Sequence, residues 1–194
     1  MKETITFDVS YPAYYSKPVW FSTCPLDSIY IGRNIKYDFT PQGYGTYSLS
    51  PFREKQTLRK VVFGNDVTII PSARFDGCIN LISVETPEKM DSIGSSVFKG
   101  CERLSSFTIP YGIKTIGNYA FYGCKSLSSI VIPESVKTIN EYAFYDCVGL
   151  SSLVIPNSIK IIEKLSFGMC TSLSEIHFQD SEEPLTIGER NYHI

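Results

Sequence analysis

The sequence has no excess of charge of either sign and no long hydrophobic run. Its 194 residues carry 18 lysines and arginines against 20 aspartates and glutamates, so the formal net charge is −2. It has no run of lysine or arginine and no acidic tail, so the sequence lacks the electrostatic signature of a protein that binds nucleic acid or anionic membranes. No apolar run reaches the roughly 20 residues of a transmembrane helix. We therefore expect neither a nucleic-acid partner nor insertion into a membrane.

The N-terminal residues also lack the continuous apolar stretch of a secretory signal. Charged residues and a proline interrupt the stretch MKETITFDVSYPAYY, where a signal peptide would need an unbroken apolar core. An export signal that had been removed from a mature chain would leave no trace. The sequence of this region therefore does not decide the localisation.

Histidine is scarce, and the motifs of common enzymes are missing. Only His177 and His193 occur, and neither lies in an evident arrangement of nucleophile and base. The patterns GxSxG, GxxxxGK and HExxH are missing as well. The paired carboxylates Glu182 and Glu183 lie beside a proline, where a solvated acidic turn is the simpler interpretation. We expect a protein that is not an enzyme and uses no cofactor.

The sequence does contain a regular internal repeat. Phenylalanine and leucine each return six times at a constant spacing and cysteine five times, with Lys55 in the cysteine place of the first regular repeat. A fixed period of this length is typical of solenoids, in which each unit packs on its neighbours to form one continuous core. The recurring residues are Phe52, Phe75, Phe98, Phe121, Phe144 and Phe167; Leu58, Leu81, Leu104, Leu127, Leu150 and Leu173; and Cys78, Cys101, Cys124, Cys147 and Cys170.

Each repeat predicts two short strands and a tight turn. Written from its leucine, the unit reads LxxIxIPxxIxxIGxxAFxxCxx. In LSSIVIP, Ile130 and Ile132 point to one face and Val131 to the other, and Pro133 ends the strand because it cannot donate to a ladder. A segment such as VKTI forms the second strand, and the AF pair precedes one helical or 3₁₀ turn. The strands of successive coils should pair in parallel about 4.8 Å apart.

The pattern LxxIxIPxxIxxIGxxAFxxC resembles the 23-residue leucine-rich repeat of the BspA-like family. The match covers roughly residues 21–192, and spacing and residue identity agree together within 75–178. The resemblance implies an α/β repeat: a right-handed solenoid with parallel short strands on a concave face, and short second strands and helical or 3₁₀ turns on the other sides. It also implies a bacterial cell-surface or secreted protein, an extracellular location, and a role in adhesion or interaction with a host.

The two ends of the chain depart from the repeat. Residues 1–25 are expected to form an N-terminal cap or partial repeat, because the terminal units of a solenoid are atypical. The array is expected over 26–178, with a loop inserted around 33–51. Residues 179–194 are interpreted as a degenerate last repeat or a C-terminal cap. Ile187 falls on the isoleucine of the IG pair of the repeat if two residues are inserted.

Aromatic residues concentrate near the N-terminus. Seven of the thirteen tyrosines lie between Tyr11 and Tyr47. The simpler interpretation is a cap over the first coil. An alternative is an aromatic platform that binds a glycan or a peptide, for which Trp20, Tyr44 and Tyr47 are the candidate residues.

The repeated cysteines are expected to pack and not to react. A zinc site needs ligands that converge on one point, whereas these cysteines occur once per coil. Equivalent positions in a stack have parallel Cβ vectors, which disfavours disulfides. We expect five free, buried thiols that act as small hydrophobic side chains. Cys24 lies outside this series, and its burial stays open.

Two ladders of side chains should point outward from the first strands. Together the two ladders form a broad face. The side chains in its middle are small and weakly polar, so this face is a candidate surface for a protein partner. The uniform serines are equally consistent with a repeat consensus that serves only solubility and packing. A structural spacer within a longer surface protein is a further alternative. The candidate binding residues are Tyr30, Val62, Glu85, Thr108, Val131, Val154 and His177 in one ladder and Ser106, Ser129 and Ser152 in the other.

Overall fold

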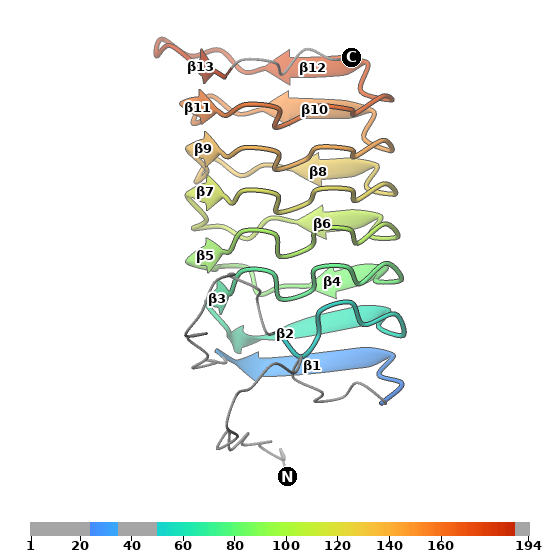
Figure 1. Cartoon of the computed structure of the whole chain (residues 1–194). Helices are drawn as coiled ribbons and strands as arrows, with labels where there is room; N and C mark the ends of the chain where they lie inside the picture. Colours follow the sequence, from blue (N-terminus) through green and yellow to red (C-terminus); the bar gives the residue numbers. More distant parts are fainter. Residues whose placement is uncertain (1–23, 35–49, 189–194) are drawn as a thin grey trace, which may run out of the picture.

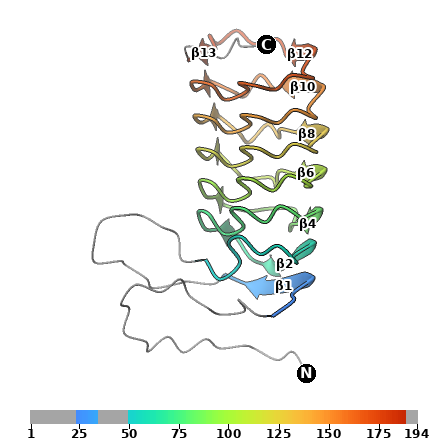
Figure 2. The same ribbon diagram turned by 45° about the vertical axis from the view of Figure 1, so that its right-hand side comes forward.

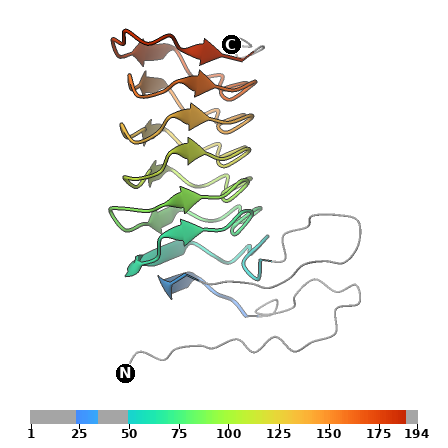
Figure 3. The same cartoon turned by 90° about the vertical axis from the view of Figure 1, so that its left-hand side faces the viewer.

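The chain forms a straight-sided column of stacked coils (Figure 1). The computed structural model describes residues 24–34 and 50–188. From the second described coil onward, each coil contributes one strand to each of two faces, which lie on different sides of the column (Figures 2 and 3). We call them the long-strand face and the short-strand face. The long-strand face consists of β1 (Ser28–Arg33), β2 (Lys60–Asp66), β4 (Ser83–Glu85), β6 (Ser106–Thr108), β8 (Ser129–Val131), β10 (Ser152–Ile155) and β12 (Glu175–Phe178).

The short-strand face is one continuous parallel sheet. Each of its six strands pairs with the short strand of the next coil, so the sheet follows the order of the sequence. Each strand has only two residues, the first facing outward and the second facing the core, as in the exposed Thr115 and the buried Ile116. The strands are β3 (Ile69–Ile70), β5 (Ser92–Ile93), β7 (Thr115–Ile116), β9 (Thr138–Ile139), β11 (Ile161–Ile162) and β13 (Thr186–Ile187).

The predicted register of the repeat governs the pairing on both faces. Ser106 pairs with Ser129, Thr108 with Val131, and Ile116 with Ile139, each step being one repeat. On the long-strand face the hydrogen-bonded ladders group as β1-β2-β4, β6-β8 and β10-β12. The parallel solenoid that the repeat predicted is therefore confirmed.

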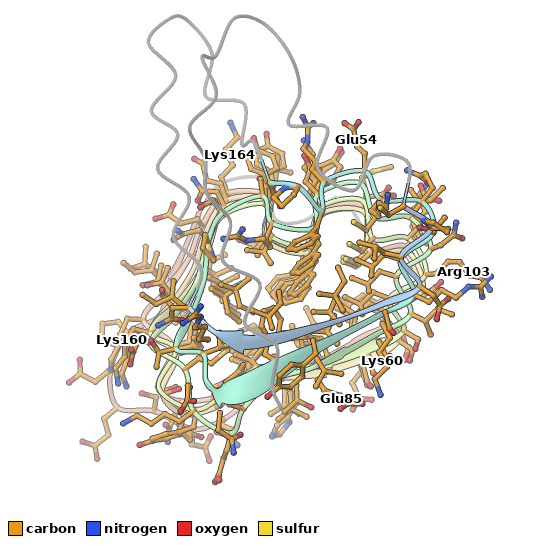
Figure 4. The ribbon with its side chains drawn as sticks, turned by 90° about the horizontal axis from the view of Figure 1, so that it is seen from below. Glu54, Lys60, Glu85, Arg103, Lys160 and Lys164 are labelled. Atoms are coloured by element: carbon orange, nitrogen blue, oxygen red, sulfur yellow. The ribbon has the colours of Figure 1, made fainter. Side chains whose placement is uncertain are left out.

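A column of stacked phenylalanine rings forms the centre of the core. The rings of the six repeated phenylalanines lie on one another, with centroid distances between 5.2 Å for Phe121 and Phe144 and 5.9 Å for Phe75 and Phe98. Offset or parallel stacking of this kind adds to the gain from burial. Repeated leucines and isoleucines pack around the rings, and the view along the column shows them filling its interior (Figure 4).

The predicted helical or 3₁₀ turns are wrong. The residues that the structure describes contain no helix, and the segment after each AF pair consists of turns, so this part of the chain is an all-β solenoid and not an α/β repeat. In five successive turns, the residues two before and two after the repeated phenylalanine have positive φ, for example Tyr119 at 57° and Gly123 at 68°. A helix cannot propagate through residues in the left-handed region.

Hydrogen bonds between coils explain why the turns take this conformation. The backbone N–H groups of Tyr119, Phe121 and Gly123 donate to carbonyls of the next coil, at 3.1, 2.8 and 2.8 Å. A helix would direct these donors along its own chain. Backbone groups in a buried turn need partners, and here the neighbouring coil supplies them. Glycine suits position 123 because it has no Cβ to oppose a positive φ.

The predicted domain boundaries stay a prediction. Residues 1–23 of the proposed cap, 35–49 of the inserted loop and 189–194 of the C-terminal segment lie outside the described residues. In the last described coil, Ile187 of β13 pairs with Ile162 of β11, in agreement with a repeat lengthened by two residues. Its apolar residues are partly exposed, with Phe178 at 47%.

The ring column predicts a graded loss of stability along the repeat. Phe121→Ala should lower the free energy of unfolding by about 3–5 kcal/mol, because it empties a fully buried site between two stacked rings. Phe167→Ala should cost less, because among the described residues its ring stacks only on Phe144. Urea unfolding measures both. Equal losses at the two positions would contradict a column that is strongest in its middle, and Val131→Ala, at an exposed position, provides the control.

Candidate functional site

The long-strand face brings the predicted outward residues into one column. We call Tyr30, Val62, Glu85, Thr108, Val131, Val154 and His177 the outer ladder. Strand pairing sets Tyr30 beside Val62, Thr108 beside Val131, and Val154 beside His177. Ser106 and Ser129 pair in the second ladder, and Ser152 continues it beside Glu175. The alternation of the strands therefore assembles the candidate residues on one surface.

The middle of the outer ladder is apolar and exposed. Val131 has 72% of its surface exposed and Val154 has 49%. Thr108 and the serines beside these residues are also exposed and carry no charge. Charged groups border this patch. Lys60 and Glu85 form an ion pair toward β1, as Figure 4 shows, and Glu175 lies in β12 at the other end.

Tyrosines form a second aromatic cluster beside the turns. Tyr119 stacks on Tyr142 with centroids 5.0 Å apart, and Tyr122 stacks on Tyr145 at 5.2 Å. The ammonium group of Lys99 lies 5.6 Å from the ring centroids of both Tyr119 and Tyr122. Burial, and then the neighbouring Tyr142 and Glu141, raise the pKa of the Tyr119 hydroxyl. The ring faces are occupied by one another, so packing accounts for this cluster.

The five repeated cysteines are free and buried, as predicted, and Cys24 is exposed. Each buried thiol donates to the carbonyl of a phenylalanine in the preceding coil. A thiol at this position thus fills space and also satisfies a backbone acceptor. The Sγ–O distances are 2.8 Å for Cys78 and Phe52, 3.3 Å for Cys101 and Phe75, 3.2 Å for Cys124 and Phe98, 3.2 Å for Cys147 and Phe121, and 3.1 Å for Cys170 and Phe144.

Burial makes these thiols poor nucleophiles. It raises the pKa of Cys78 to about 12 and that of Cys170 to about 11, and it holds the pKa of Cys101, Cys124 and Cys147 well above the ordinary value. Because the thiolate is the reactive form, the column is chemically inert at neutral pH.

The described part of the chain contains no constellation for metal binding. No group of three or more histidine, cysteine, aspartate and glutamate side chains converges within it. His177 is exposed on the outer ladder, and Glu182 and Glu183 are exposed. Of this pair, Glu183 lies 3.7 Å from the ammonium group of Lys160. His193 and the proposed glycan-binding residues Trp20, Tyr44 and Tyr47 lie outside the described residues.

The described part of the chain has no helix that is long and apolar enough to cross a membrane. That the chain does not insert into a membrane stays a prediction from the sequence.

A feature that the sequence did not predict lies on the short-strand face. A shallow groove runs beside β5 and β7, with the glycine backbones of Gly94 and Gly117 in its surface. Lys114 borders this groove and begins a column of three lysines with Lys137 and Lys160. These lysines are a full repeat apart along the chain, so a scan for basic runs in the sequence does not detect them. Their common place before the second strand of each repeat was the signal that could have identified them.

Comparison with known proteins identifies the repeat. The family described as "BspA type Leucine rich repeat region" matches residues 91–192 in six copies. No curated protein gives a significant match.

Several solved structures of bacterial proteins are similar to the chain. A leucine-rich repeat protein of T. pallidum shares 28% identity with a TM-score of 0.71, over 84% of this chain and 74% of that one. One from Bacteroides ovatus shares 31% identity with a TM-score of 0.65, over 71% of this chain and 35% of that one. A leucine-rich cell surface protein from Faecalibacterium prausnitzii shares 25% identity with a TM-score of 0.58, over 81% and 48%. The chain thus spans less than half the length of the last two proteins.

The cysteine geometry predicts selective labelling. A thiol reagent at pH 8 should modify one cysteine, Cys24, in the native protein and all six after unfolding in denaturant. Absorbance of the released thiol-exchange product counts the groups. Rapid native labelling of more than one thiol would contradict the buried column, and Cys24→Ser provides a control that should show no fast reaction.

The raised thiol pKa values also predict alkaline destabilisation. The column stays protonated in the folded state, whereas unfolded thiols ionise near their ordinary pKa of 9.0. The contribution of these thiols to the free energy of unfolding is therefore fully present below about pH 9. It falls as the pH rises toward 11 or 12, by up to about 1.4 kcal/mol per pH unit for each thiol. Urea unfolding between pH 8 and 10.5 measures this slope. The double variant C124A/C147A retains the tyrosines and should show a shallower fall; an identical slope would contradict the assignment.

Proposed function

Because the chain belongs to the BspA type leucine-rich repeat family, we propose that it is a protein-interaction or adhesion module of a bacterial cell-surface or secreted protein, with the outer ladder as its contact surface. Leucine-rich repeats of this kind are in general interaction modules and not enzymes. One of the similar structures is named as a cell surface protein, which supports the proposed location.

The exposed apolar middle of the outer ladder is the observation that carries the proposed contact surface. Val131 and Val154 lie in neighbouring coils and point to solvent, and Val131, at 72%, is the most exposed of the large hydrophobic side chains in the described residues. An exposed apolar patch with a polar border is typical of a protein-interaction site. The neutral serines and Thr108 around the valines would let a partner approach without burying an unpaired charge.

The strand geometry supports a rigid contact surface. Val131 is held by the parallel pairing of β8 with β6 and Val154 by that of β10 with β12, and both are flanked in their strands by the buried residues Ile130 and Leu153. A partner would therefore meet side chains that are already positioned, which lowers the entropic cost of binding. The glycan alternative depends on Trp20, Tyr44 and Tyr47, and no observation within the described residues favours it over the protein-binding proposal.

The double variant V131D/V154D tests the proposed contact surface. We expect it to weaken binding by at least about 100-fold, because two charges would be desolvated at the centre of the interface. A panel of immobilised extracellular proteins first identifies a partner of the unaltered chain, and biolayer interferometry then measures the affinity of each variant.

Circular dichroism and thermal unfolding check that the variants fold. Because both valines are exposed, folding should change little. The matched control T115D/I161D places the same charges at exposed positions of the short-strand face. Unchanged affinity in V131D/V154D, or an equal loss in the control, would show that the outer ladder is not the contact surface.

A further inference from the structure

A column of three lysines runs along the edge of the short-strand face. Lys114, Lys137 and Lys160 each directly precede a strand of that sheet, and the pairing of β7, β9 and β11 places them one above another. The backbone N–H of Lys137 donates to the carbonyl of Lys114, and that of Lys160 to the carbonyl of Lys137, both at 2.8 Å. The backbones of successive lysines are therefore about 4.8 Å apart. Figure 4 shows Lys160 directed away from the core.

Ion pairs within the described residues do not offset the repulsion along this column at Lys114 and Lys137. Like charges at neighbouring positions of a ladder repel one another. Lys160 lies near Glu183, but within the described part of the chain no ion pair involves Lys114 or Lys137. Elsewhere in the protein, lysines of adjacent coils are matched with acids, as in the pairs of Lys125 with Glu102 and Lys60 with Glu85. Positions that break such a local rule without a structural gain point to a function.

The lysine column adjoins a groove that is rich in hydrogen-bonding groups. Lys114 lines this groove on one side, and Gly94 and Gly117 lie in its floor, where the absence of a Cβ lets each coil pack closely on the one before it. Hydroxyl groups come from the outward residues of β5 and β7 and from the turns beside them. The other polar side chains lining the groove are Ser72, Asp91, Ser92, Ser95, Thr115 and Asn140.

We propose that the lysine column and this groove form a binding site for an acidic polysaccharide that runs along the stack in an extended conformation. The ammonium groups of Lys114 and Lys137 would contact carboxylate or sulfate groups of the sugar chain. The serine and threonine hydroxyls, Asn140 and Asp91 would exchange hydrogen bonds with sugar hydroxyls. The repeat of the lysines along the stack is close to the length of one pyranose unit, so successive sugars would meet equivalent groups of successive coils.

The composition of the groove favours a polysaccharide over other polyanions. Asp91 occupies the position one coil before Lys114, and its carboxylate would repel a phosphate group placed at that coil. A sugar hydroxyl, in contrast, can donate to it. None of the described residues that line the groove is aromatic, so they do not form the platform on which single-stranded nucleic acids stack their bases. A membrane surface would not use the hydroxyls within the groove.

Oligosaccharide titrations test the proposal on the full chain. The probes are a hyaluronan fragment, a heparin fragment and a neutral dextran fragment of similar length, together with single-stranded oligo-dT and phosphatidylserine vesicles. We expect calorimetric binding of at least one acidic oligosaccharide, weakened by added salt, and none of dextran. K114Q/K137Q should weaken this binding about tenfold, which corresponds to about 1.4 kcal/mol.

A matched control separates a local site from net charge. K60Q/R103Q removes the same charge from the opposite side of the coil section (Figure 4) and should leave the affinity unchanged. An equal loss in this control, or no binding of either acidic oligosaccharide, would overturn the proposal. Binding of oligo-dT or vesicles at the same affinity and through the same lysines would overturn the polysaccharide assignment. V131D/V154D should bind the oligosaccharide normally, so the result does not depend on the outer ladder.

Discussion

The stacking of each residue on its own equivalent in the next coil is the constraint on which the whole structure depends. A single repeat unit is too small to enclose a core, so its apolar side chains are covered only when neighbouring coils repeat them in the same place. The ring column satisfies this requirement directly, because the stacked phenylalanines lie between 5.2 and 5.9 Å apart from Phe52 to Phe167. The same spacing sets the two parallel ladders and the hydrogen bonds between turns.

In-register stacking also decides which side chains can do chemistry. Inside the column it places each cysteine beside a carbonyl of the preceding coil and away from water, so a group that is reactive in isolation becomes a neutral packing element. On the outside, stacking multiplies whatever a position carries. A valine becomes an apolar patch when Val131 and Val154 are neighbours, and a lysine becomes a line of charge when Lys114, Lys137 and Lys160 align.

The two faces therefore offer different chemistry from one scaffold. The long-strand face has a neutral, apolar middle that suits a protein surface. The short-strand face has a basic edge beside a polar groove, which suits an acidic and hydroxylated chain. An adhesion module could use both at once, because the two faces point in different directions from the column (Figures 3 and 4).

By itself the sequence determined the repeat, its register, the buried columns and the outward ladder, because each of these follows from a fixed spacing and from the alternation of side chains along a strand. The residues proposed for protein binding, from Tyr30 to His177, are brought to one face as the spacing requires. Their role in binding is a separate matter that neither the spacing nor the fold establishes.

Only the tertiary structure decided the conformation of the turns and the charge of the short-strand face. The AF segments have residues compatible with a helix, yet the N–H groups of Tyr119, Phe121 and Gly123 reach partners in the next coil, and this gain depends on contacts between residues far apart in the sequence. Likewise, Lys114, Lys137 and Lys160 are isolated charges along the chain and become neighbours only when the coils stack. Local sequence reports the preferences of one unit, whereas hydrogen bonding and electrostatics between units depend on distances that exist only after folding.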